Sequence, residues 1–166
     1  MTVDYTTLVA AKTTEGSIKN YVNRSDIPVT NILLEAEAWI YEELRVREMM
    51  TDAAFTFADA TSSTSLPSAF LDPITFVPYE WGAPLPFVHE ENFRPARTSA
   101  GVLYEGSPAL WTIIGTTANV DVLCDGAFSG RLMYYAQPTA LSVSNTTNFL
   151  TTRYPTLLRH ACMMKA

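Results

Sequence analysis

Few residues in this 166-residue sequence combine types and spacing that could carry out chemistry. His89, Glu90 and Glu91 are consecutive, and an imidazole beside two carboxylates could bind a metal ion or act as an acid–base pair. A solvated loop is the favoured interpretation, because the sequence supplies few other ligands. The second histidine, His160, lies two residues before Cys162, so the two side chains do not share one helix face. We expect burial in a helix-packing face to explain both.

No motif for nucleotide binding or nucleophilic catalysis is present. No pair of glycines has the spacing of a phosphate-binding loop with a strand before it and a helix after it. There is no Gly-x-Ser-x-Gly nucleophile elbow. The two cysteines, Cys124 and Cys162, are too few for a disulfide scaffold and too isolated for a zinc site. We therefore expect no catalytic, cofactor-binding or metal-binding residue, and no cofactor.

Carboxylates and arginines alternate in the most periodic part of the chain. Glu35 and Glu42 lie two turns apart on one helix face, which is typical of a solvated stripe. Glu42 precedes Arg45 by three residues and Glu43 precedes Arg47 by four, which are the spacings of ion pairs within a helix. The alternative is that the two arginines anchor a partner.

The first element that must position these residues is a long helix. Residues 1–52 have a helical pattern, and residues 28–50 show apolar side chains at three- and four-residue steps. This periodicity predicts an amphipathic helix of about six turns. Ser25 or Asp26 is expected to cap it, with Pro28 in its first turn.

Residues 53–138 change to short apolar runs separated by turns rich in glycine and proline. Such runs predict a small antiparallel sheet or sandwich. The predicted strands are residues 54–58, 74–77, 110–114, 120–123 and 132–135. Residues 61–65 are expected to form a flexible linker, and residues 80–101 a long loop or an edge hairpin.

Residues 139–166 return to a helical pattern, with candidate caps from Ser144 to Asn148 and with Pro155 at the start of a helical turn. The formal charge is −4 over residues 1–52, −5 over residues 53–138 and +3 over residues 139–166. The acidic first segment and the basic last one are suited to pack together. The predicted architecture is α+β: a helical bundle of residues 1–52 and 139–166 with a small antiparallel β domain inserted at residues 53–138.

Composition excludes several classes of protein. Apolar residues make up 48% of the chain, charged residues 17%, and the mean hydropathy is +0.06, so the chain can bury a core and is not disordered. A net charge of −6 without any basic run argues against a protein that holds nucleic acid through its phosphates. Because no apolar stretch is long enough for a membrane span and the start does not resemble a signal peptide, we expect a soluble protein.

Several segments, taken in order, resemble the head-to-tail connector (adaptor) proteins of tailed bacteriophages. They are residues 21–26, 34–38 with 43–49, 66–71 (LPSAFL), 106–108 with 111–115, and 132–135, 141–142, 145–150 and 154–158 near the end. Their order and spacing over nearly the whole chain make the match specific. The chain departs from the family pattern at residues 123–125, where a proline usually follows the fourth strand, and at Ala166, after which the family usually continues with helical sequence.

The resemblance implies a helical bundle with an inserted β domain, and copies arranged as a ring of about twelve beneath the portal. Such a ring continues the DNA channel and docks the next tail or neck component, without a catalytic site or cofactor. It implies that DNA passes through without specific binding and that no membrane is involved. The implied location is the neck of the virion, between capsid and tail, after assembly in the bacterial cytoplasm.

A channel through which DNA slides is better lined by acidic or neutral groups than by lysine and arginine. We therefore expect Glu35 and Glu42 to face the channel. The scarce arginines of the acidic part are expected at the contacts between subunits, together with one glutamate. These interface residues are Glu43, Arg45, Arg47, Arg94 and Arg97.

Two other functions compete with a connector. One is a small protein- or carbohydrate-binding module on a helical scaffold, with Trp111 and the aromatic residues at 76–81 as the binding surface. Joint exposure of these aromatic side chains would favour it. The other is a hydrolase or metal enzyme centred on residues 89–91.

Overall fold

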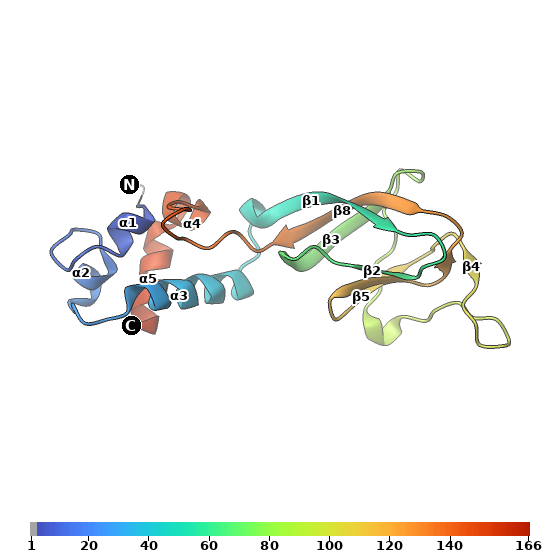
Figure 1. Ribbon diagram of the computed structural model, residues 1–166, viewed down its shortest axis with the longest axis horizontal. Helices are drawn as coiled ribbons and strands as arrows, with labels where there is room; N and C mark the ends of the chain where they lie inside the picture. The colour runs from blue at the N-terminus through green and yellow to red at the C-terminus, as the bar shows by residue number, and fades with distance from the viewer. Residues whose placement is uncertain (1–2) are drawn as a thin grey trace. The chain divides into compact units, whose positions relative to one another are not determined.

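The computed structural model describes residues 3–166 and confirms the α+β class (Figure 1). The chain folds into two compact units. The helical unit comprises Met1–Met49 and Gln137–Ala166, and the β unit comprises Met50–Ala136. Each contains one free, buried cysteine: Cys162 in the helical unit and Cys124 in the β unit. Burial raises the pKa of the Cys124 thiol to about 11 and that of Cys162 to about 12.

The helical unit is built from short helices that meet around one of them. Its elements are α1 (Tyr5–Leu8), α2 (Ile18–Val22), α3 (Val29–Glu43), the 3-10 helix η1 (Arg47–Met49), α4 (Phe149–Arg153) and α5 (Pro155–Lys165). Helix α5 contacts α2, α3 and α4, and the apolar core between them includes Leu33, Ile40 and Leu158. These short helices do not establish the predicted bundle.

The predicted six-turn helix is wrong in length, because α3 ends at Glu43. Leu44 adopts an extended backbone conformation (φ −100°, ψ 138°). The Nη1 group of Arg45 then donates to the carbonyl oxygens of Tyr41 (2.6 Å) and Leu44 (3.0 Å). A side chain thus satisfies carbonyl groups that a continued helix would bond through its own backbone. As a consequence, Arg47 lies in η1 and does not share a helix face with Glu43.

Capping residues and proline predict the starts of α4 and α5 correctly, but not the cap of α3. Asn148 caps α4 in a capping box with Thr151, and Pro155 begins α5, as the sequence predicts. Neither Ser25 nor Asp26 caps α3: Pro28 occupies the N-cap position and makes no side-chain bond there. Asp26 instead pairs with the Arg24 guanidinium at 2.9 Å.

The β unit contains two three-stranded antiparallel sheets and one short parallel pair. The sheets are β1-β8-β3, β2-β6-β5 and β4-β7, from strands β1 (Met50–Phe57), β2 (Ser63–Ser65), β3 (Phe70–Pro78), β4 (Glu105–Gly106), β5 (Trp111–Ile114), β6 (Thr117–Val120), β7 (Leu123–Cys124) and β8 (Phe128–Ala136). The expected antiparallel sheet is confirmed, although the predicted strand at 120–123 is divided between β6 and β7.

The flexible linker predicted at residues 61–65 is wrong. Residues 63–65 form strand β2, which pairs antiparallel with Thr117–Asn119 of β6. Hydroxyl side chains fit this position because an edge strand is partly solvated, and threonine favours extended backbone. Residues 80–101 do form the predicted long loop, which includes the 3-10 helix η2 (Glu90–Asn92). Leu85 connects this loop to the sheets by two hydrogen bonds. Its N–H donates to the Phe76 carbonyl oxygen, and its own carbonyl oxygen accepts from Trp111 Nε1 (3.1 Å).

Aromatic rings fill the core of the β unit around Phe76. Its ring meets four others edge-on, with centroid separations from 5.9 to 6.1 Å. These neighbours are Phe55, Phe57, Trp111 and Phe128. Gly130 of β8 makes the close approach possible, because a Cβ atom there would lie 2.6 Å from Phe76 Cε2 and 2.6 Å from the Val77 carbonyl oxygen.

Candidate functional site

His89 and the two glutamates after it lie on an exposed turn of the β unit. His89 is the N-cap residue of η2 and makes no capping hydrogen bond, and its ring packs edge-on against Phe87 at 5.6 Å. Within residues 3–166, no three His, Cys, Asp or Glu side chains lie close enough together to hold a metal ion. This geometry matches the solvated-loop interpretation of the segment.

The two side chains at the end of α5 point to different environments. Cys162 is fully buried, as predicted, whereas His160 is exposed, so its predicted burial is wrong. Two residues advance a helix by more than half a turn, which places the two side chains on different faces. Only the cysteine lies on the packing face.

The carboxylates of α3 occupy two different environments. Glu35, Glu42 and Glu43 are exposed. Glu37 is 1% exposed and lies on the buried face with Leu33 and Ile40. In the sequence, only its phase with the apolar residues distinguishes Glu37 from the neighbouring glutamates.

Glu37 is the centre of a buried hydrogen-bond network within the helical unit. Its Oε1 accepts from the Tyr41 hydroxyl (3.0 Å) and from Asn148 Nδ2 (2.7 Å), and its Oε2 accepts from the backbone N–H of Leu141 (3.0 Å). Asn148 Nδ2 also donates to the Tyr41 hydroxyl at 2.9 Å. The network joins α3 to the segment that leads into α4, so it fixes how the two sequence pieces of the helical unit pack.

Burial raises the pKa of Glu37 above its usual value of 4.5, and its hydrogen bonds oppose the shift without cancelling it. Between 4.5 and the raised pKa, the folded chain keeps a proton that the unfolded chain releases. The free energy of unfolding should therefore fall as the pH rises through this window, by at most about 1.4 kcal/mol per pH unit. Urea denaturation at several pH values will measure this for the wild type and Glu37→Gln. The free energy of unfolding of the wild type, minus that of Glu37→Gln, should shrink as the pH rises. If this difference grows instead, the pKa of Glu37 is not raised in the folded chain.

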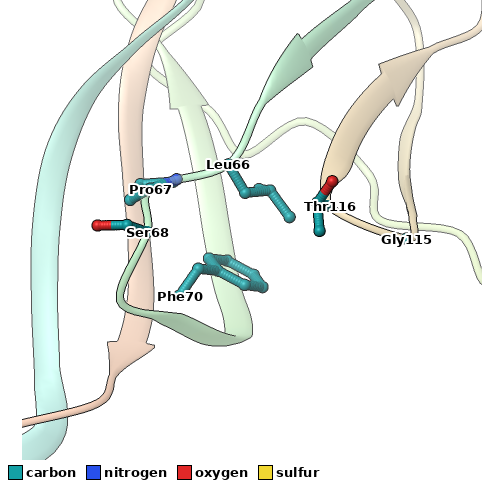
Figure 2. Close-up of a pocket in the computed structure, with 6 residues that line it drawn as sticks. All are labelled: Leu66, Pro67, Ser68, Phe70, Gly115 and Thr116. Carbon is teal, nitrogen blue, oxygen red and sulfur yellow. The ribbon is translucent and has the colours of Figure 1, made fainter.

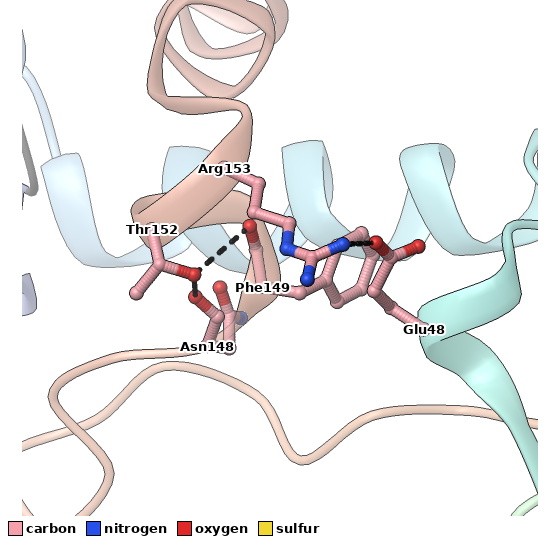
Figure 3. A network of polar contacts seen from close by, with 5 residues as sticks. All are labelled: Glu48, Asn148, Phe149, Thr152 and Arg153. Atoms are coloured by element: carbon pink, nitrogen blue, oxygen red, sulfur yellow. Dashed lines mark hydrogen bonds and ion pairs between the residues drawn. The ribbon is translucent and has the colours of Figure 1, made fainter.

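Arginines and a glutamate gather where α3 and α4 end. The Arg153 guanidinium extends from α4 to Glu48 of η1 and forms an ion pair with it (Figure 3). With Arg47 these two residues line a polar cleft of about 410 Å³. The sequence predicted Arg45 and Arg47 as contact residues, but Arg153 and Glu48 were missed because they are 105 residues apart.

Arg94 and Arg97 lie on the long loop of the β unit, and both are exposed. Arg94 donates to the carbonyl oxygens of Glu91 (2.9 Å) and Phe93 (2.8 Å), and Arg97 to that of Gly101 (2.6 Å). Each guanidinium thus shapes its own loop while part of it faces solvent. These two arginines belong to a different unit from Arg45.

Charge is distributed unevenly between the two units. The helical unit contains eight acidic and eight basic residues, whereas the β unit contains nine acidic and three basic ones. The formal charge of −6 therefore resides entirely on the β unit. A surface of this kind repels phosphates and attracts cationic groups of other proteins.

Comparison with known protein families gives one match over almost the entire chain. The model of the SU10 adaptor protein family matches residues 5–166. The chain belongs to the SU10 adaptor protein family. No curated protein gives a significant match. Membership makes this chain a structural adaptor of phage particles, a class that is generally not enzymatic. No helix in the described part of the chain is long and apolar enough to cross a membrane.

The LPSAFL segment of the β unit forms one side of a small pocket (Figure 2). The pocket has a volume of about 180 Å³, and Gly115 and Thr116 of the β5–β6 turn complete its lining with Leu66, Pro67, Ser68 and Phe70. The Leu66 N–H donates to the Thr116 carbonyl at 3.0 Å, which holds the turn and the segment together. The pocket is smaller than typical small-molecule sites.

The binding-module alternative depends on four aromatic side chains of the β unit. These side chains are divided between core and surface. Trp111 is 1% exposed and Phe76 is 0% exposed, whereas Tyr79 is 64% and Trp81 is 42% exposed. Two of the four side chains are therefore committed to packing. An apolar groove of about 490 Å³ lies elsewhere on the β unit, with Phe87 and Ile113 in its lining.

Proposed function

We propose that this chain is a head-to-tail connector subunit, which assembles as a ring between the portal and the next tail or neck component and continues the DNA channel. The observation that carries the proposal is the family match over residues 5–166. We further propose that the helical unit is the body of the subunit, a bundle formed from both ends of the chain, and that the β unit is a domain inserted into it. The proposed ring has about twelve copies and acts in the virion neck.

Charge supports a channel that DNA crosses without adhering. The three exposed carboxylates of α3 and the acidic β unit offer phosphates no attractive surface. A DNA-binding protein would instead display clustered lysine and arginine. Here the sequence has no basic run, and Arg24, Arg131 and Arg153 are each paired with a carboxylate.

Sedimentation velocity of the chain alone and mixed with the portal protein of the same phage tests the proposal, with electron microscopy of any fast-sedimenting species. We expect a ring on the portal, and the images will give its copy number. A chain that stays monomeric and ignores the portal would contradict the connector function.

Reversal of the charge on Arg47 is expected to weaken ring assembly by about tenfold or more, because a like-charge contact across an interface is unfavourable. Arg47 is the better target than Arg45, whose side chain also completes the end of α3. Sedimentation of Arg47→Glu with the portal is the measurement. Arg24→Glu, at an arginine that pairs with Asp26, is the matched control. Equal assembly of both variants would remove Arg47 from the interface.

Replacement of Glu35 and Glu42 by lysine is expected to slow DNA ejection from assembled particles, because ammonium groups in the channel would bind phosphates. The double variant Glu35→Gln, Glu42→Gln removes the same carboxylates without adding cations and should eject DNA at nearly the wild-type rate. The rate of DNA release from purified particles is the readout. Unchanged ejection by the lysine variant would place these residues outside the channel.

A further inference from the structure

Arg159 of α5 differs from the other arginines of the described chain in how its donors are used. Its side chain is half-buried, and its Nε group is buried without a hydrogen-bond acceptor among residues 3–166. Its Nη1 donates to the Tyr21 hydroxyl at 3.2 Å, which is a neutral acceptor. A buried donor without a partner is unfavourable, and the neutral Tyr21 hydroxyl does not balance the charge of the guanidinium. An anionic acceptor from outside the chain would therefore be stabilising at the accessible part of this group.

The surroundings of Arg159 form a pocket of about 320 Å³ within the helical unit. Its lining consists of Glu15, Gly16, Asn20, Tyr21 and Arg159 itself. The guanidinium carbon lies 4.9 Å from the centre of the Tyr21 ring, so the ring holds the charged group in place. Gly16 has φ +88°, and a Cβ atom there would lie only 3.0 Å from Arg159 Nη2. A glycine at this position keeps the guanidinium accessible from the pocket.

A guanidinium held on an aromatic ring is suited to bind a carboxylate. A single cation balances one carboxylate but not a doubly charged phosphate. Glu15 on the rim further disfavours a more strongly charged anion. Glu15 itself forms no ion pair with Arg159. The pocket thus lacks its complementary anion, and its chemistry fits an aspartate or glutamate side chain.

A neighbouring copy of the chain can supply that side chain. The β unit has nine acidic and three basic residues, whereas the helical unit is balanced. In an assembly of identical subunits, the net excess of carboxylates therefore belongs to the β units. We propose that the Arg159 pocket of one copy receives a carboxylate from the β unit of the next copy. This proposal rests on the proposed ring, and a contact between two different surfaces is the kind that closes into a ring.

Cross-linking identifies the partner carboxylate directly. Full-length Arg159→Lys chains, half of them isotope-labelled, are assembled with the portal and treated with a carbodiimide, which joins an amine to a carboxylate in contact with it. We expect mixed-label peptides that join position 159 to an acidic residue within 50–136. Arg24→Lys is the matched control and should couple within its own copy to Asp26. Coupling of position 159 only to Glu15 of the same copy, or only to the portal, would overturn the proposal.

Assembly strength gives a second, independent readout. Arg159→Gln removes the charge and should weaken assembly by about 30-fold or more. Arg159→Lys keeps the charge and should weaken assembly less. Circular dichroism of each variant checks that the fold persists. If the wild type and Arg159→Gln form equal rings on the portal, the pocket is not an interface, although the connector function stands. If the wild type forms no ring at all, both proposals fail.

Discussion

Replacement of Glu37 by alanine is expected to lower the free energy of unfolding of the helical unit by about 3 kcal/mol or more. The change removes the acceptor of the Leu141 N–H and of the Tyr41 hydroxyl, and one of the two acceptors of Asn148 Nδ2. Each buried donor that loses its acceptor costs about 1–3 kcal/mol. Urea denaturation, followed by the helical signal in circular dichroism, is the measurement.

Glu35→Ala is the matched control for this prediction, because the same residue type lies exposed two positions earlier on the same helix. Its effect should stay within about 0.5 kcal/mol. If both variants lose the same stability, the loss of a carboxylate from α3, and not the network, explains it. If neither loses stability, the network contributes nothing to the packing of the helical unit.

Gly130→Ala should destabilise the β unit by about 3 kcal/mol. The new methyl group would lie 2.6 Å from Phe76 and from the Val77 carbonyl oxygen, so a ring at the centre of the core or the β3 backbone must move. Strand β8 pairs with both β1 and β3, which restricts any such movement. Near-ultraviolet circular dichroism during urea denaturation reports on the aromatic cluster that would be displaced.

The control for Gly130 is Gly126→Ala, at a glycine with no atom within 4 Å of the added methyl position. This variant should unfold close to the wild type. A small effect at Gly130 as well would mean that β3 and β8 separate easily, and that the close approach of Phe76 contributes little to stability.

Signals confined to a few neighbouring residues predicted the structure well. Pro155 begins α5 and Asn148 caps α4, because these residue types favour helix starts whatever surrounds them. The strands expected at residues 110–114 and 132–135 also form, as β5 and as part of β8. The α+β class follows from the same local patterns.

Features that depend on distant partners were beyond such patterns. The end of α3 depends on Arg45, which folds back onto carbonyl groups instead of extending to solvent. Strand β2 exists because β6, more than fifty residues later, offers it an edge. The role of Glu37 depends on Leu141 and Asn148, at the other end of the chain. The Arg159 pocket was likewise missed, since it joins α5 to residues near Gly16.

In the native chain, the rate at which each buried thiol is alkylated reports how often the structure around it opens. Because the thiolate is the form that attacks an alkylating reagent, Cys124 and Cys162 should react only after their surroundings open and their pKa values fall towards that of a free thiol. One thiol belongs to each unit, so the mass shifts of two peptides yield two separate opening rates without any mutation. Labelling before and after mixing with a partner will therefore show in which unit the partner slows local opening.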